Sequence, residues 1–395
     1  MVSPATVRIV ATGDNHLNRF YDRMPPQKLE ERRSYLRQGF QAAVDHALSW
    51  PAHLFCITGD LFDQSDPRNV DRAFVADCLE RLRTAGVRVY AVSGNHDTPR
   101  HSGQQGGTTP YEVYSYLGAL HYFDRIAEIE TDVVEIAGLR LAIGGVCPDP
   151  AAPAGSDPLA GIVWSNRPAD ADLGILLLHS PLEGHMPPDW ETPQIARQTL
   201  ETLDGADLIL IGDSHQPYTQ QIGSRTVIAP GATECMTFGE NGDLPGFVAL
   251  ELGRGPRITW RRIGLQGQPR AELHVRVADL DADDPLADLI RRVRAICTPE
   301  TLVKLHLEGI VTRDRYHALS LRPLHEAIQP HAFHFTVDTA GLYLEDEQHQ
   351  VAERGVRASQ PEAIRVYAAE LLASAGGSDE RTAIEEALNR LLARY

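Results

Sequence analysis

Short apolar runs recur along the first half of the chain and predict buried strands. Each run is rich in β-branched residues or leucine, as expected for strands that are covered on both faces. The runs are Val7–Ala11, Leu54–Thr58, Val87–Val92, Leu173–Leu178 and Leu208–Ile211. We expect them to form the interior of one folded core.

Two longer stretches between these runs have helical periodicity. Lys28–Trp50 places Leu36, Phe40 and Val44 on one face, and Asn69–Ala85 is a second amphipathic stretch that ends before Gly86. Strands that alternate with helices are typical of an α/β fold.

The pattern changes near Ala271. Leu273, Val275 and Val277 alternate as in a strand, and two further alternating runs follow with helical stretches between them. We therefore predict a core domain over 1–268, a small α+β domain over 269–345 and a helical tail over 346–395. Two short amphipathic helices cannot bury their apolar faces alone, so the tail must pack on the body or on a partner.

Side chains that can bind metal ions follow each predicted strand of the core. In chain order they are Asp14 and His16, Asp60 and Asp63, Asn95, His96 and Asp97, His179, and finally Asp213 and His215. Ligands in α/β folds bind at the carboxyl ends of the strands, so we expect these side chains to converge. One such motif alone is typical of an ordinary turn, whereas the ordered set is specific.

The amino-acid composition argues against several classes of protein. The chain has 395 residues, 43% of them hydrophobic, and five scattered cysteines without a CxxC pair. A disulfide framework or a zinc–thiolate site is therefore not expected. Because no apolar run has the length of a membrane span and the N-terminus has no secretory pattern, we expect a cytoplasmic protein without a membrane contact.

The chain is strongly acidic, with a net charge of −17 from 37 basic and 54 acidic residues. Such a charge argues against a protein that coats nucleic acid nonspecifically, and it suits a chain that gathers divalent cations. It leaves room for an enzyme that meets DNA through a local basic patch. Arg32, Arg33 and Arg37 on the first predicted helix are interpreted as a solvated face, with contact to phosphates as the alternative.

The order of the motifs resembles that of the calcineurin-like metallophosphoesterase superfamily. The motifs are Asp-x-His at 14–16, Gly-Asp at 59–60, Gly-Asn-His-Asp at 94–97, a histidine at 179 and Gly-x-x-His at 212–215. The stretch APGATECMTFGE at 229–240 resembles a signature of SbcD-type nucleases, and the small domain after it resembles their DNA-capping domain. This family includes the archaeal and eukaryotic meiotic-recombination nucleases of double-strand-break repair.

The resemblance implies a β-sandwich flanked by helices that holds two Mn²⁺ ions, with Mg²⁺ as a substitute. It assigns one ion to Asp14, His16 and His215. It assigns the other to Asn95, His179 and Asp213, with Asp60 as the bridge. His96 becomes the general acid or the donor to the transition state, and Asp97 orients an imidazole.

The activity implied is that of a DNA nuclease. The resemblance suggests a 3′-to-5′ exonuclease with endonuclease activity on single strands, acting on DNA ends as a dimer with an SbcC-type coiled-coil ATPase. The tail would then dock on that ATPase. Two alternatives stay open: a phosphodiesterase or phosphatase acting on small nucleotides, and a scaffold subunit without activity.

Two residues depart from the pattern of the family. Asp213 occupies a position where histidine is common, which adds one negative charge to the site and favours manganese or magnesium over zinc; the alternative is a lost second ion and a weak enzyme. Asp63 occupies a position where some members have histidine. It indicates the bacterial branch or is simply a turn residue.

Replacing Asp213 by histidine tests the first departure. Asp213→His removes one negative charge and should shift the metal preference from manganese toward zinc, because imidazole nitrogen suits zinc better than carboxylate oxygen does. Phosphodiesterase rates measured across a series of divalent ions would check this. If both the preference and the rate are unchanged, the idea is wrong.

Overall fold

The computed structural model describes residues 6–22, 24–100, 107–185, 192–240, 244–254 and 258–345, together with residues 372 and 381. The chain divides into two compact units. Unit 1 comprises residues 1–270 and 300–302, and unit 2 comprises 271–299 and 303–395. The predicted helical tail over 346–395 lies outside the described residues, apart from those two positions.

Unit 1 contains two six-stranded sheets. The first has the order β12-β11-β1-β2-β3-β4, in which β1 to β4 run parallel and β11 and β12 are antiparallel. Its strands are β1 (Val7–Thr12), β2 (Leu54–Thr58), β3 (Arg88–Val92), β4 (His121–Tyr122), β11 (Gly246–Leu252) and β12 (Ile258–Gly264).

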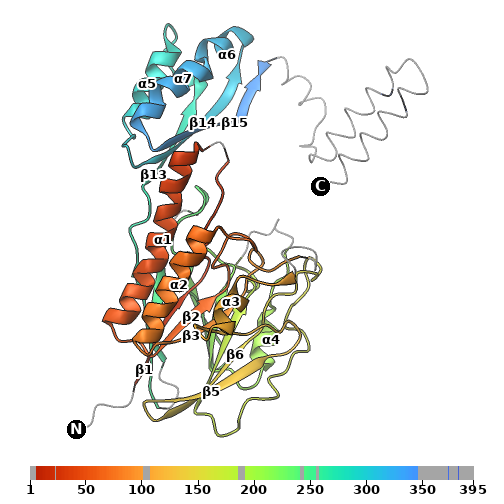
Figure 1. Ribbon diagram of the computed structural model, residues 1–395. Helices are drawn as coiled ribbons and strands as arrows, with labels where there is room; N and C mark the ends of the chain where they lie inside the picture. The colour runs from red at the N-terminus through yellow and green to blue at the C-terminus, as the bar shows by residue number, and fades with distance from the viewer. Residues whose placement is uncertain are drawn as a thin grey trace. The chain divides into compact units, whose positions relative to one another are not determined.

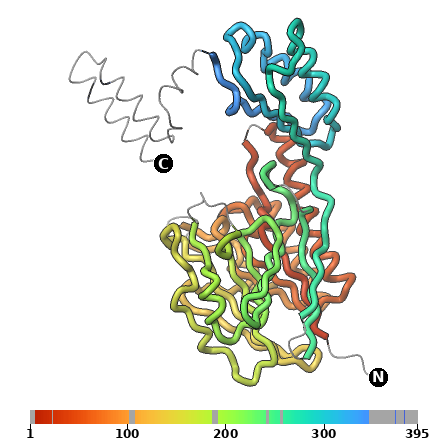
Figure 2. Tube along the Cα trace, turned by 180° about the vertical axis from the view of Figure 1, so that it is seen from behind, coloured from red at the N-terminus to blue at the C-terminus, as the bar shows by residue number. Residues whose placement is uncertain are grey.

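The second sheet has the order β5-β6-β7-β8-β10-β9 and is parallel from β6 to β10. Its strands are β5 (Glu130–Ile136), β6 (Leu139–Gly145), β7 (Leu173–His179), β8 (Leu208–Gly212), β9 (Tyr218–Ile222) and β10 (Arg225–Ala229). They appear in yellow to green and lie together in Figure 2.

The two sheets pack face to face. One hydrophobic cluster combines Ile9 and Val92 of the first sheet with Ile143 and Leu177 of the second. Neighbouring strand residues such as Val10 point the other way, into a cluster with the helices. Both faces of the central strands are buried, which explains why these strands appear in the sequence as unbroken apolar runs. The predicted α/β fold with a sandwich is confirmed.

Helices cover the outer faces of the sandwich. The pair α1 (Pro26–Ser49) and α2 (Asn69–Thr84) packs on the first sheet, and α4 (Arg197–Thr202) packs with loops on the second (Figure 1). A shorter helix, α3 (Tyr111–Tyr116), precedes β4. The prediction placed α1 and α2 within two residues of their observed bounds, because their apolar stripes are long and regular.

Arg32 on α1 is a correction to the predicted solvated face. Its side chain is fully buried, and its guanidinium lies 3.2 Å from a carboxylate oxygen of Glu234 and 3.2 Å from the side-chain oxygen of Gln268. Arg37 is half-buried and pairs with Asp71. A buried arginine that is paired on several sides holds elements together and does not face solvent.

Unit 2 is a three-stranded sheet with helices packed on one face. The strand order is β13-β14-β15 (Figure 1). Apolar residues of the helices pack against Leu305, Leu307 and Phe335 of the sheet. Its elements are β13 (Arg270–Arg276), η2 (Val277–Asp279), α5 (Pro285–Arg294), β14 (Leu302–Val311), α6 (Arg313–Leu319), α7 (Leu321–Ile328), η3 (Gln329–His331) and β15 (His334–Leu344).

The sequence pattern missed α6. This helix has seven residues and buries only Leu319, so it shows no apolar period. Ser320, with φ of 36°, separates it from α7. In the described part of the chain, none of the helices is both long enough and apolar enough to cross a bilayer.

Gly39 on α1 is expected to resist replacement by alanine, although alanine favours helices by about 1 kcal/mol. A Cβ atom at Gly39 would lie 2.5 Å from the carbonyl oxygen of Thr233. We expect Gly39→Ala to lower the free energy of unfolding by about 1–3 kcal/mol, as overpacking does. Urea denaturation would measure this, with exposed Gln41→Ala on the same helix as the control; equal stability of the two variants would contradict the prediction.

Candidate metal centre

Side chains from both sheets meet where the central parallel strands end. The loops that follow β1, β2 and β3 supply residues from the first sheet, and the ends of β7 and β8 supply residues from the second. All seven predicted ligands are in this cluster: Asp14, His16, Asp60, Asn95, His179, Asp213 and His215.

Two groups within the cluster have ligand atoms that all lie within 4.8 Å of one another. One is Asp14, His16 and His215, and the other is Asp14, Asp60 and His179. Nε2 of His179 also lies 3.1 Å from Oδ1 of Asn95 and 3.6 Å from Oδ1 of Asp213. The two groups share Asp14, so they form adjoining parts of one centre.

Three imidazoles in the centre share one hydrogen-bonding pattern, with an oxygen acceptor at Nδ1. Nδ1 of His179 donates to the carbonyl oxygen of Thr58 at 2.7 Å, which leaves Nε2 to face the carboxylates. Nδ1 of His16 lies 3.0 Å from Asp63, and Nδ1 of His215 lies 3.0 Å from Glu240. An acceptor behind one ring nitrogen sets the tautomer and directs the other nitrogen to a metal ion.

The buried carboxylates fit a divalent ion. Asp14 is fully buried, and no hydrogen bond to its Oδ2 exists among the described residues. Its other oxygen accepts the amide of Asp213 at 3.1 Å. An unpaired buried carboxylate oxygen is costly, and coordination to a cation removes that cost. Carboxylate oxygens combined with imidazole nitrogens suit Mn²⁺ and other divalent ions of the first transition row.

The electrostatics of the centre favour charged forms. Burial by itself would raise the pKa of Asp60, but the charge and hydrogen bond of His179 bring that pKa below its usual range. Burial would lower the pKa of His179, yet Asp60 and Asp213 hold it well above the ordinary value. A cation that binds Nε2 must displace this proton, so metal affinity falls as the pH falls.

The backbone is strained at four of the ligands. Asp14, His16, Asp60 and Asp213 have φ of 49°, 45°, 49° and 75°. Left-handed conformations cost about 1–3 kcal/mol at residues other than glycine, and they persist where the surrounding structure enforces them. Their concentration at one centre is an independent sign of function.

Glycines in the motifs provide room for neighbouring ligands. A Cβ atom on Gly94 would lie 2.0 Å from Oδ1 of Asp60, and one on Gly59 would lie 2.2 Å from Nδ1 of His179. Gly59 has a positive φ of 95° in addition. Close approach of side chains is therefore the reason for Gly94, whereas Gly59 serves both close approach and a left-handed turn.

His96 lies at the edge of the centre. Its ring packs edge-on against His16 with a centroid distance of 4.7 Å, and its side chain is 41% exposed. Nδ1 donates to the carbonyl oxygen of Asp63 at 3.2 Å, so Nε2 is available to a substrate. The carboxylate of Asp63 binds His16 and also Arg19, at 2.9 Å.

Asp97 differs from its predicted role. It accepts the amides of Gly94 and Phe62 at 2.7 and 3.2 Å and the hydroxyl of Tyr111 at 2.7 Å. Burial and the charge of Asp60 raise its pKa to about 7. It therefore fixes the loop that carries Asn95, and the orientation of imidazoles falls to Asp63 and Glu240.

Glu240 is the residue that motif analysis missed. It lies in the stretch 229–240, which resembles a family signature, but spacing along the chain does not show that it meets His215 in the fold. Burial would raise its pKa, but the hydrogen bond from His215 brings it below the usual value. The amide of Met236 donates to its second oxygen at 2.8 Å, which holds the carboxylate in place.

A cavity of about 220 Å³ adjoins the centre. Asn95, His179 and Asp213 form one wall, and Arg100 lies on its lining. A ligand that enters this cavity would meet these side chains directly.

The comparison with protein families agrees with this geometry. A family model described as calcineurin-like phosphoesterase matches residues 7–217, more than half of the chain. The chain belongs to the calcineurin-like phosphoesterase family. Members of this family use divalent metal ions, which agrees with the clusters described above.

Several curated proteins are similar to this chain. The DNA double-strand break repair protein Mre11 of Haloferax volcanii is 26% identical over 305 residues, covering 76% of this chain and 61% of that protein. The protein of the same name from Methanopyrus kandleri is 23% identical over 71% of this chain and 64% of its own length. The uncharacterized metallophosphoesterase YhaO of Bacillus subtilis is 25% identical over 55% of this chain and 52% of its own. The chain thus spans less than two thirds of each relative.

Glu240 should control metal affinity through His215. Glu240→Gln is expected to weaken binding of Mn²⁺ by about 10–100-fold, because an amide cannot hold the imidazole as strongly as a carboxylate does. Isothermal titration calorimetry with Mn²⁺ would measure this. Glu251→Gln, an exposed change on β11, serves as the control; affinities within twofold for both variants would refute the role.

Proposed function

We propose that this chain is a metal-dependent nuclease that processes DNA ends in repair, with two Mn²⁺ ions as cofactors. The observation that carries the proposal is the convergence of the Nε2 atoms of His16, His179 and His215 with two buried carboxylates. The names of the archaeal relatives supply the substrate class.

Each side chain has a distinct role in this proposal. Asp14, His16 and His215 would hold one ion, and Asn95, His179 and Asp213 would hold the second. Oδ2 of Asp60 lies 3.6 Å from Nε2 of His16 and 3.4 Å from Nε2 of His179, so Asp60 would serve both ions. When bound, the ions activate a water molecule and stabilise the charge that develops on the phosphate.

His96 handles the proton at the leaving group. Its Nε2 faces away from the carbonyl that holds Nδ1, and its exposure gives it access to a phosphodiester bound at the centre. General acid catalysis by such a group accelerates a reaction by about 10²–10⁴-fold. Asp63 and Asp97 position the ring and its loop.

The finer activity extends the same proposal. We infer 3′-to-5′ exonuclease activity together with endonuclease activity on single strands, in a homodimer that works with an SbcC-type ATPase. The small domain over 269–345 would cap the DNA, and 346–395 would dock on the ATPase. The location would be cytoplasmic.

An assay with three substrates tests the proposal. The purified chain with Mn²⁺ receives end-labelled duplex DNA, single-stranded DNA and a small chromogenic phosphodiester. We expect DNA degradation that falls by about 10²–10⁴-fold in His96→Ala with bound metal unchanged. Exposed His317→Ala should retain the rate of the wild type.

The other outcomes identify the alternatives. Activity on the small ester alone would indicate a phosphodiesterase for small substrates. No activity on any substrate, with both ions bound and the ATPase added, would indicate a scaffold subunit. Degradation of DNA that is equal in wild type and His96→Ala would contradict the role of His96.

A further inference from the structure

Unit 2 has a polar sheet face opposite its helices. Along β14, Leu305 and Leu307 are buried against the helices, whereas His306, which lies between them, and Glu308, which follows Leu307, point to the other side. The residues on that side are Glu272, His274, Lys304, His306, Glu308 and Asp338, and we call them the polar sheet face. The function proposed above makes no use of this face.

Three of these side chains converge on one point. The ligand atoms of Glu272, His274 and His306 all lie within 4.8 Å of one another. Oε2 of Glu272 is 2.9 Å from Nε2 of His306. The rings of His274 and His306 are stacked in parallel, with centroids 4.2 Å apart.

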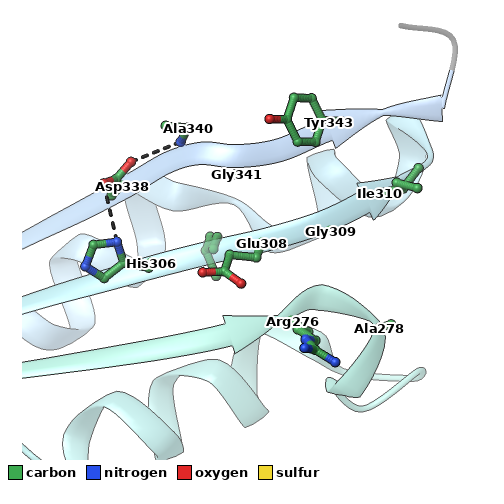
Figure 3. Close-up of a pocket in the computed structure, with 11 residues that line it drawn as sticks. Arg276, Ala278, His306, Glu308, Gly309, Ile310, Asp338, Ala340, Gly341 and Tyr343 are labelled. Carbon is green, nitrogen blue, oxygen red and sulfur yellow. Dashed lines mark hydrogen bonds and ion pairs between the residues drawn. The ribbon is translucent and has the colours of Figure 1, made fainter. Parts of the chain in front are cut away.

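Two further carboxylates lie against the Nδ1 atoms of these rings. Oε1 of Glu308 lies 3.0 Å from Nδ1 of His274. Oδ2 of Asp338 lies 3.4 Å from Nδ1 of His306, as Figure 3 shows. An acceptor at Nδ1 is the arrangement of metal-binding histidines, and at His306 a cation would take the place of the proton between Nε2 and Glu272. The same arrangement holds the imidazoles of unit 1.

Asp338 is well suited to this supporting role. The amide of Ala340 donates to it at 3.0 Å, and the ammonium group of Lys304 lies 3.2 Å away. These two contacts lower the pKa of Asp338, so it stays ionised as an acceptor at neutral pH.

A cavity provides room beside the cluster. It has a volume of about 650 Å³, and its lining includes His306, Glu308, Asp338 and Tyr343 (Figure 3). Of the three converging side chains, only His306 lines this cavity, together with the two carboxylates that contact the rings.

We propose that Glu272, His274 and His306 bind one divalent transition-metal ion such as zinc on the polar sheet face. Glu308 and Asp338 would hold the two imidazoles in place. Two imidazole nitrogens and one carboxylate oxygen suit zinc, copper or nickel better than magnesium or calcium. Tetrahedral ligands of zinc lie about 3.3 Å apart. Because His274 is 60% exposed, its side chain can rotate to that separation without disturbing the core.

The same contacts would occur in a set of surface ion pairs between neighbouring strands. Such pairs contribute little to stability and require no cation. The two interpretations differ in one measurable quantity, the number of zinc ions that the chain binds.

Metal stoichiometry tests the site in the full chain. The protein is dialysed against low micromolar Zn²⁺, and bound zinc is measured by mass spectrometry. His274→Gln/His306→Gln should bind one zinc ion fewer per chain than the wild type. The control His317→Gln/His331→Gln changes two exposed histidines of the same unit and should bind as many as the wild type. Equal zinc in all three proteins would overturn the proposal.

Two further measurements keep the test decisive. Asp338→Asn should leave the stoichiometry unchanged and weaken the affinity of this one ion by about 10–100-fold, which the loss of an ion pair alone would not do. Diffraction at the zinc edge from crystals soaked with zinc should show an anomalous peak between His274 and His306. A zinc signal confined to unit 1 would refute the site even if the double variant failed to fold.

Discussion

Burial of charge between the two sheets of unit 1 is the constraint on which the metal centre depends. Asp14, Asp60 and His179 are almost completely removed from solvent, and taking an ion out of water costs several kcal/mol. Protein partners compensate part of that cost, since Asp60 and His179 shift each other's pKa toward the charged forms. Oδ2 of Asp14 has no hydrogen-bond partner among the described residues, so a bound cation would offset the rest of the desolvation cost. Metal ions therefore stabilise the charges that the fold buries.

The sandwich is rigid enough to enforce this arrangement. The strands that carry the ligands are buried on both faces, so their ends cannot move apart without exposing apolar side chains. This packing also supports four ligands in left-handed backbone conformations. The stretch 229–240 also supports the centre through three contacts. Thr233 accepts a hydrogen bond from Asn15, Glu234 pairs with Arg32, and Glu240 binds His215. These contacts explain physically why this stretch accompanies the metal motifs.

The two units offer different ligands to cations. The centre of unit 1 is buried and rich in carboxylates, which favours hard ions that polarise a phosphate. The polar sheet face of unit 2 is partly exposed and combines two imidazoles with carboxylates. A chain with a net charge of −17 can therefore concentrate cations of two chemical classes in separate places.

The sequence by itself determined the class of fold, the central strands and long helices, and the residues of the metal cluster. It could do so because buried strands and amphipathic helices leave regular apolar patterns, and because each ligand directly follows a strand. Tertiary structure alone decided the role of Arg32, the loop contacts of Asp97, and the pairing of Glu240 with His215. These depend on which distant segments meet, and a one-dimensional pattern does not contain that information. The convergence of Glu272 with His274 and His306 is of the same kind, since strand register places them together across the sheet.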